Sequence, residues 1–133
     1  ADILLYSDAD TLYHAEPDLD YLSEISPADS LCTFFDRPKF RDETGFYMHN
    51  PQHPRAKEWA NRLEEIYLSG EVWTYEKDRA ADQYTMAFGR DSFKDCKQMD
   101  LMTYHEGVDP KDPVPTSPLN NFLQHLKGEK KTA

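Results

Sequence analysis

Ile3-Leu4-Leu5-Tyr6-Ser7-Asp8-Ala9-Asp10-Thr11 is the stretch that decides the fold, and it lies near the start of a chain of 133 residues. Its apolar first half predicts a buried strand over Asp2–Ser7, with two aspartates one residue apart where that strand ends. In open α/β sheets, ligands gather at the carboxyl ends of strands, so this position suits a functional site. We therefore expect an α/β fold organised around Asp8 and Asp10.

The Asp-x-Asp pair formed by Asp8 and Asp10 indicates a metal site. A buried carboxylate is unfavourable unless a cation or a basic side chain accompanies it. Mg²⁺ and Mn²⁺ take oxygen ligands and often bridge to a substrate phosphate. We therefore expect this pair to bind a divalent metal that holds the diphosphate of a nucleotide sugar.

Composition indicates a chain that folds, with 38% hydrophobic and 13% aromatic residues. The net charge is −10, from 25 acidic and 15 basic side chains, which argues against direct nucleic-acid binding because that needs a basic face. The two cysteines, Cys32 and Cys96, form no C-x-x-C unit, which favours a reducing cytoplasm over a disulfide framework. No apolar run has the length of a membrane span.

The spacing of apolar residues predicts alternating strands and helices along the rest of the chain. The most regular pattern is a helix over Pro54–Ser69, with its apolar stripe ending in Ile66 and Tyr67 and a capping glycine at Gly70. The basic loop Arg37–Arg41 is interpreted as a solvated turn, with a phosphate or acceptor contact as the alternative. The other elements that we expect are a helix over Pro17–Ile25, strands over Ser30–Asp36, Glu43–Asn50 and Lys97–Tyr104, an extended segment over Glu71–Tyr75, the start of a helix over Ala80–Phe88, a proline-rich loop over His105–Pro118 and a closing helix over Pro118–Leu126.

The C-terminal segment contains a His-x-x-Gly-x-x-Lys motif formed by His125, Gly128 and Lys131, with His125 at the expected helix end. An imidazole would complete a mixed nitrogen and oxygen site that suits Mn²⁺ better than Mg²⁺. The ammonium of Lys131 would neutralise a phosphate oxygen, and the glycine frees the backbone. Taken alone, the segment favours the other interpretation, a basic and frayed C-terminus that carries an exposed histidine.

Four motifs in this order resemble those of the glycogenin-like family 8 of metal-dependent glycosyltransferases. They are Asp8-Ala9-Asp10, then Glu43-Thr44-Gly45 with Asn50, then Asp82-Gln83, and then His125-x-x-Gly128-x-x-Lys131. The chain also resembles a group of small bacterial and phage glycosyltransferase-like proteins, through its DADT, E-x-G-F and SPL…HLKG segments. The resemblance implies the metal and acceptor part of a GT-A fold, with a mixed sheet and flanking helices.

The resemblance also implies how the ends of the chain bind the donor. Asp8, Asp10 and His125 would ligate Mn²⁺ or Mg²⁺, and Gly128 and Lys131 would contact the diphosphate of a UDP-sugar. The family places its nucleotide-binding strands before the Asp-x-Asp motif, whereas few residues precede it here. We therefore expect one GT-A-like domain over residues 1–133 that is incomplete at its N-terminus, with the preceding segment supplied by the same or another chain.

The reacting centre that the resemblance implies is formed by the middle of the chain. Asp82 and Gln83 would face the donor sugar, and Thr44 and Gly45 would line the same pocket between the donor and an unknown acceptor. Transfer in this family retains the anomeric configuration. Where the family has Asn before the small residue and Gly, this chain has Glu43, which changes the polarity beside the sugar.

Two other functions fit parts of the same sequence. A haloacid-dehalogenase-like phosphatase also begins with a strand and two aspartates, but it needs Thr two residues beyond the second Asp, where this chain has Leu12. A degenerate GT-A domain would keep the fold and act as a binding or interaction module without activity. The sequence ranks the metal-dependent glycosyltransferase, a hexosyltransferase-like enzyme, above both alternatives.

Overall fold

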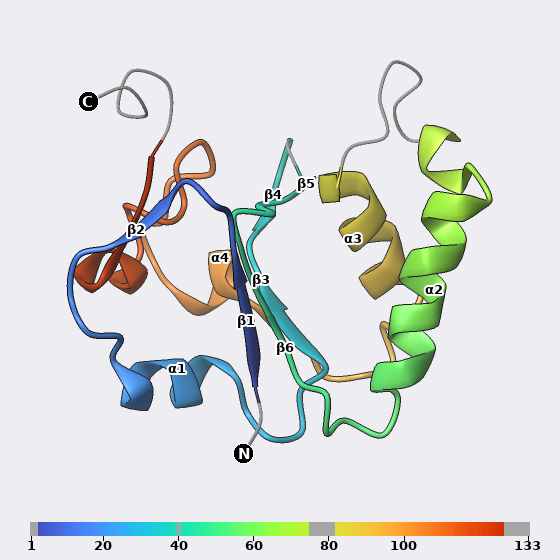
Figure 1. Cartoon of the computed structure of the whole chain (residues 1–133), viewed down its shortest axis with the longest axis horizontal. Helices are drawn as coiled ribbons and strands as arrows, with labels where there is room; N and C mark the ends of the chain where they lie inside the picture. Colours follow the sequence, from blue (N-terminus) through green and yellow to red (C-terminus); the bar gives the residue numbers. More distant parts are fainter. Residues whose placement is uncertain (1–2, 40, 75–81, 127–133) are drawn as a thin grey trace.

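A four-stranded mixed sheet forms the centre of the molecule in the computed structural model, which describes residues 3–39, 41–74 and 82–126 (Figure 1). The strands lie in the order β1 (Leu4–Ser7), β6 (Phe46–His49), β3 (Cys32–Phe34) and β7 (Met99–Asp100). β6 is antiparallel to both β1 and β3, whereas β3 and β7 are parallel. The predicted α/β class, with a mixed sheet and flanking helices, is therefore confirmed.

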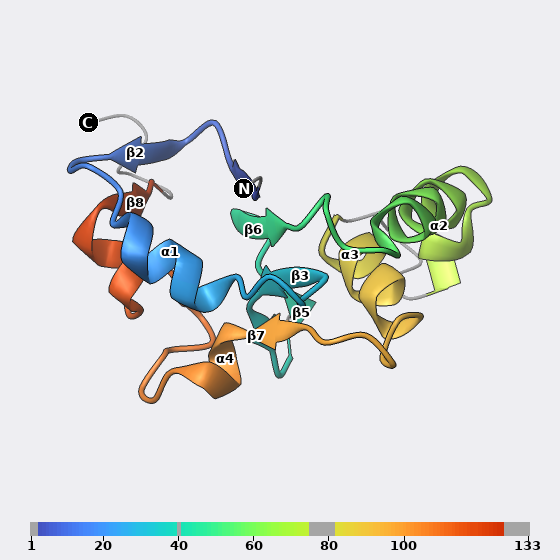
Figure 2. The same cartoon turned by 90° about the horizontal axis from the view of Figure 1, so that it is seen from below.

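Helices cover the two faces of this sheet. α1 (Leu19–Ile25) and α4 (Leu101–Tyr104) lie on one side, and α2 (Ala56–Leu68) and α3 (Asp82–Asp91) lie on the other (Figures 1 and 2). None of the helices within the described ranges combines the length and apolar character that crossing a membrane requires.

Two core clusters stabilise the two faces, and β6 contributes to both because successive strand residues point to opposite faces. The cluster on the α1 side contains Ile25, Phe35, Phe46, Met48, Leu101, Val108, Val114, Leu119, Phe122 and Leu123. The cluster on the α2 side contains Leu31, Cys32, Phe34, Tyr47, Trp59 and Phe93. Phe46 and Met48 thus face one cluster, and Tyr47 faces the other.

Two small antiparallel ribbons flank the central sheet. β2 (Thr11–Tyr13) pairs with β8 (Leu123–His125), and β4 (Asp36–Arg37) pairs with β5 (Arg41–Asp42). The carboxyl end of β1, both ribbons and the start of α3 all lie toward the upper end of the molecule in Figure 1. Parts of the chain that carry the predicted motifs therefore share one end of the fold.

The predicted closing helix over Pro118–Leu126 is wrong, and this changes the environment of His125. A 3₁₀ helix, η2 (Pro118–Asn121), begins where the Ser117 hydroxyl accepts from the Leu119 amide at 3.3 Å. The chain then becomes β8, because the edge of β2 offers a backbone partner for the ladder. Apolar residues at helical spacing are thus buried by a turn followed by a strand, and His125 lies in a strand instead of at a helix end.

The strand predicted over Lys97–Tyr104 is also shorter than expected. Only Met99–Asp100 is extended, because the Asp100 carboxylate accepts from the Met102 amide at 3.0 Å and caps α4. The segment Glu71–Tyr75 was predicted to be extended, but its described part forms a 3₁₀ helix, η1 (Glu71–Thr74).

The helix predicted over Pro54–Ser69 is confirmed as α2, with ends that differ by one or two residues. Gly70 follows it at a φ of 81°, a left-handed conformation that glycine adopts without strain. Trp59 and Ile66 are buried as expected, but Tyr67, which was assigned to the same apolar stripe, is 55% exposed.

Candidate functional site

The carboxyl end of β1 lies against the turn that precedes β6. The antiparallel register pairs Ser7 with Phe46, and the Asp8 amide donates to the Gly45 carbonyl at 3.3 Å. The Tyr6 hydroxyl donates to Asp8 Oδ1 at 3.0 Å, which orients that carboxylate. The structure therefore brings Asp8 beside Thr44 and Gly45, two of the residues predicted to line the pocket.

The other aspartate of the motif lies against the C-terminal strand. The Thr11 amide donates to the Asp8 carbonyl at 3.0 Å, which closes a tight turn between β1 and β2. Thr11 then pairs with His125, and the Leu126 amide donates to the Asp10 carbonyl at 2.9 Å. The backbone at His125 thus lies beside the Asp-x-Asp motif, although the two segments come from opposite ends of the sequence.

Several predicted binding groups lie outside the part of the chain that the structure describes. These are the side chain of His125 and the whole of Gly128 and Lys131. Within residues 3–39, 41–74 and 82–126, no three side chains of His, Cys, Asp or Glu form a group able to hold a metal. The metal site of Asp8, Asp10 and His125 therefore stays a prediction.

Asp82 and Gln83 begin α3, and only their backbone is described. Their helix starts at the same end of the fold as the carboxyl end of β1 (Figure 1). One turn further along α3, Thr85 and Met86 face a cavity. The backbone of the predicted reacting residues therefore precedes the cavity-lining residues by about one helical turn.

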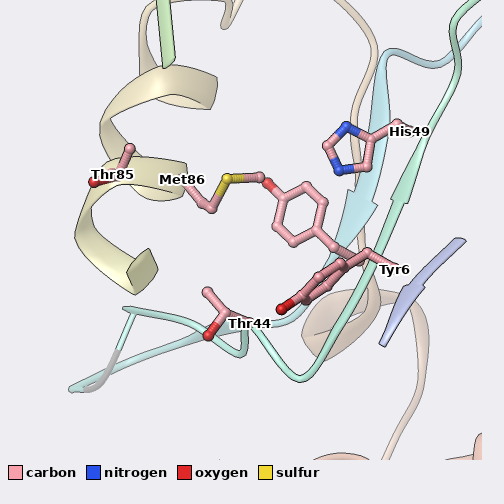
Figure 3. A pocket seen from close by; sticks show the side chains of 6 residues that line it. Tyr6, Thr44, His49, Thr85 and Met86 are labelled. Carbon is pink, nitrogen blue, oxygen red and sulfur yellow. The ribbon is translucent and has the colours of Figure 1, made fainter. Parts of the chain in front are cut away.

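The cavity has a volume of about 260 Å³ and lies between β1, β6 and α3. It is lined by Tyr6, Thr44, Tyr47, His49, Thr85 and Met86. Figure 3 shows the rings of β1 and β6 facing the Met86 side chain, with the Tyr6 hydroxyl directed toward Thr44. Burial lowers the pKa of His49, so its imidazole is neutral at pH 7 and can both donate and accept a hydrogen bond.

A buried ion pair supports the cavity from behind. Arg90 Nε donates to the two carboxylate oxygens of Asp42 at 3.0 and 3.1 Å, and Arg90 Nη2 lies 2.9 Å from Asp36 Oδ2. The Tyr47 hydroxyl donates to Asp42 Oδ2 at 3.2 Å, and the guanidinium lies 4.3 Å from the centre of the Phe34 ring. Asp42 is 0% exposed, so each of its hydrogen bonds replaces one that water would make.

This Asp42–Arg90 pair links two parts of the candidate site. Asp42 ends β5, two residues before Thr44, and Arg90 lies in the last turn of α3. Burial raises the pKa of Asp42 to about 6, although hydrogen bonds and charge from Arg90 oppose the rise. Sequence reasoning missed the pair, and the available signal was an arginine that follows the apolar helix segment 86–88.

The basic loop and Glu43 also have structural partners. Arg37 donates from Nε to the Arg41 carbonyl at 2.9 Å and from Nη2 to the Asp42 carbonyl at 3.1 Å. Arg41 Nη2 lies 3.0 Å from Asp91 Oδ2, so both arginines hold the ribbon in place, and the solvated-turn interpretation is wrong for these two side chains. Glu43 Oε1 accepts from the Gly45 amide at 2.9 Å, so this carboxylate stabilises the turn.

Comparison with models of protein families, with curated proteins and with solved structures found no match for this chain. Its function is therefore inferred from its own residues and their arrangement.

Proposed function

We propose that this chain is a metal-dependent glycosyltransferase domain of the GT-A type, which transfers a sugar from a UDP-sugar to an acceptor with retention of configuration. The pairing of β2 with β8 carries the proposal, because it joins the two segments to which metal and diphosphate binding are attributed. In particular, the Leu126 amide donates to the Asp10 carbonyl at 2.9 Å.

Asp8, Asp10 and His125 would hold the metal ion. Two carboxylates and one imidazole form a mixed donor set that suits Mn²⁺. Carboxylate ligands are commonly oriented by hydrogen bonds from neighbouring groups, and the Tyr6 hydroxyl supplies one to Asp8 at 3.0 Å. When bound, the ion supplies Lewis-acid stabilisation of negative charge on the departing diphosphate.

The other predicted residues act on the two halves of the donor. The Lys131 ammonium would neutralise a phosphate oxygen, and Gly128 would let the backbone approach the diphosphate. Asp82 and Gln83 would face the sugar, where a carboxylate stabilises positive charge that develops on the ring. Thr44 lines the cavity together with Thr85 and Met86 of α3 and would position the sugar or the group that receives it.

Two measurements on the full-length protein test this proposal. Mn²⁺ together with UDP should raise the melting temperature, since a ligand that binds only the folded state stabilises it. Asp10→Asn should abolish the rise, whereas Asp20→Asn, at an exposed position in α1, should retain it. Release of UDP from UDP-glucose, UDP-galactose or UDP-N-acetylglucosamine in the presence of Mn²⁺ should follow the same pattern.

The outcomes separate the competing functions. A rise in melting temperature that is unaffected by Asp10→Asn, or no rise at all in the wild-type protein, would contradict the proposal. Metal-dependent binding of UDP without release from any donor would instead indicate the degenerate, non-catalytic domain. Hydrolysis of phosphate esters without any response to UDP would indicate the phosphatase.

A further inference from the structure

A second cavity, with a volume of about 240 Å³, lies between the turn that joins β4 to β5 and the loop that follows α4. The described residues that line it are Pro38, Lys39, Asp109, Pro110 and Lys111. Two Pro-Lys dipeptides from distant parts of the sequence thus meet at one cavity, in a protein whose net charge is −10. We refer to it as the Lys39–Lys111 cavity.

The basic side chains around this turn divide into two groups. Arg37 and Arg41 have carboxylate partners, since Arg37 Nη1 lies 3.7 Å from Glu43 Oε2 and Arg41 Nη2 lies 3.0 Å from Asp91 Oδ2. Among residues 3–39, 41–74 and 82–126, no carboxylate lies within ion-pair distance of the ammonium of Lys39 or of Lys111. The phosphate contact that the sequence allows for the basic loop therefore remains open for Lys39.

Asp109 is the acidic side chain among the described lining residues, and its loop holds it in place. Asp109 Oδ1 accepts from the Lys111 amide at 2.9 Å, and the Asp109 amide donates to Thr116 Oγ1 at 2.8 Å. Two ammonium groups thus face one carboxylate, a balance that favours an anion over a cation. An anion in contact with both ammonium groups would also relieve their mutual repulsion.

Both loops are restrained before a ligand binds. A proline fixes φ directly before each lysine. In the β4–β5 turn, Arg37 Nε donates to the Arg41 carbonyl at 2.9 Å, and Arg41 has a φ of 58°, which is strained for a residue with a Cβ. Strain of this kind persists where the surrounding structure holds it, and it clusters at ligand-binding sites. Restrained loops also lose less conformational entropy when a ligand binds.

A phosphoryl group has the charge and the acceptors that match this cavity. At pH 7 a phosphate monoester carries a charge of about −1.5 to −2 and three acceptor oxygens, so it can accept from both ammonium groups at once. A carboxylate carries one negative charge on two oxygens. The volume of about 240 Å³ is below the roughly 300 Å³ at which pockets for drug-sized ligands begin, so it suits a phosphoryl group with a short organic substituent.

We propose that the Lys39–Lys111 cavity binds the phosphoryl group of a small phosphate monoester. None of the described residues that line it is assigned to the metal ion or to the UDP-sugar. The site is therefore separate from the proposed donor site, and it does not depend on the transferase function.

Phosphate binding is measured on the full-length protein without metal or nucleotide, in a buffer free of phosphate. The probes are glycerol 3-phosphate and inorganic phosphate, with acetate at equal ionic strength as the carboxylate comparison. The readout is the NMR signal of the backbone amides of Lys39 and Lys111. We expect both phosphates to shift these signals at millimolar concentration and acetate to bind more weakly. If neither phosphate shifts the signals, or if acetate binds as tightly as phosphate, the proposal is overturned.

Substitution of each lysine tests the position of the ligand. Both side chains are exposed, so Lys39→Gln and Lys111→Gln preserve the fold. Each change should weaken binding of glycerol 3-phosphate about fivefold, the factor that corresponds to one exposed charge pair at about 4 Å. Lys57→Gln, at an exposed position in α2, is the matched control and should leave the affinity unchanged. Equal affinities in all three variants would overturn the assignment.

Asp109→Asn tests the sign of the charge at the same cavity. The Asn side-chain oxygen can still accept from the Lys111 amide, so the loop is kept while a negative charge is removed. The affinity for glycerol 3-phosphate should rise about fivefold. Asp20→Asn, at an exposed position in α1, removes the same charge elsewhere and should have no effect. An affinity that is unchanged in Asp109→Asn would contradict the proposal.

Failure of this inference can be distinguished from failure of the transferase. The rise in melting temperature with Mn²⁺ and UDP should be the same in Lys39→Gln as in the wild type. Loss of that rise in Lys39→Gln would assign the lysine to the donor site and overturn a separate phosphate site. Phosphate binding that requires both Lys39 and Lys111 supports the site, and it does so even if Mn²⁺ and UDP have no effect.

Discussion

Removal of the Arg90 guanidinium should destabilise the fold more than any other single change to its charged groups. In Arg90→Met, the Asp42 carboxylate stays 0% exposed but loses its cation, while the Tyr47 hydroxyl still donates to it. Breaking a buried ion pair by removing one partner costs about 3–5 kcal/mol. The lost contact between the guanidinium and Phe34 adds about 0.5–1 kcal/mol.

The expected loss in the free energy of unfolding is therefore about 4 kcal/mol, a large part of the roughly 5–15 kcal/mol that a domain has. Urea denaturation at pH 7 measures it directly. The deficit should shrink at pH 5, because protonation of Asp42 removes the uncompensated charge. Arg62→Met is the matched control: Arg62 pairs with Glu65 and Glu71 at the surface, and such surface pairs contribute about 1 kcal/mol or less each.

A double-mutant cycle tests the physical reason. Asp42→Asn should relieve most of the cost of Arg90→Met, so that the two changes together cost about 2–3 kcal/mol less than their sum. The reasoning is refuted if Arg90→Met and Arg62→Met cost the same, or if the Asp42 and Arg90 changes are additive.

Three further predictions follow from single contacts. Burial raises the pKa of Asp42 to about 6, so protonation of this carboxyl stabilises the fold below pH 4, and the stabilisation is lost as the pH rises through 6. Relative to Asp42→Asn, the free energy of unfolding of the wild type should therefore fall by up to about 3 kcal/mol across that range, as measured by urea denaturation at each pH. Gly89→Ala places a Cβ against the Leu63 side chain, so it should lower the melting temperature, and Leu63→Ala in the same chain should recover part of the loss. A melting temperature unchanged by Gly89→Ala would contradict the close approach of α2 and α3. Leu126→Pro removes the amide that donates to the Asp10 carbonyl, so it should weaken Mn²⁺ binding in a calorimetric titration, whereas Leu126→Ala keeps the amide and should not. Equal Mn²⁺ affinities of the two variants would contradict a role of β8 in the metal site.

Local sequence patterns were sufficient to predict an element whose structure depends only on its own residues. α2 followed from apolar residues at helical spacing and from Gly70, because both the stripe and the cap are properties of a short window. The closing segment has the same kind of spacing through Leu119, Phe122 and Leu123, yet it forms η2 and β8. The deciding partner is β2, which lies at the other end of the chain, and no local window contains it.

The candidate site also has one part that the sequence predicts and another that it does not. The Asp-x-Asp motif at the end of a strand was readable from the sequence, because a short apolar run and two acids suffice to predict it. The partners of Asp42 could not be predicted, since its cation comes from α3 and its hydrogen-bond donor from β6. Charge counting treated the arginines of 37–41 as solvated, whereas tertiary contacts pair them with nearby carbonyls and carboxylates.

The central claim is that the two ends of the chain form one metal site, and pulsed EPR of bound Mn²⁺ tests it most directly. With UDP present and ¹⁵N-labelled histidine, we expect one nitrogen coupling to the ion in the wild type. His125→Ala should remove that coupling, and His14→Ala, at an exposed position near β2, should leave it unchanged. A bound ion without nitrogen coupling, or a coupling that persists in His125→Ala, would contradict the account.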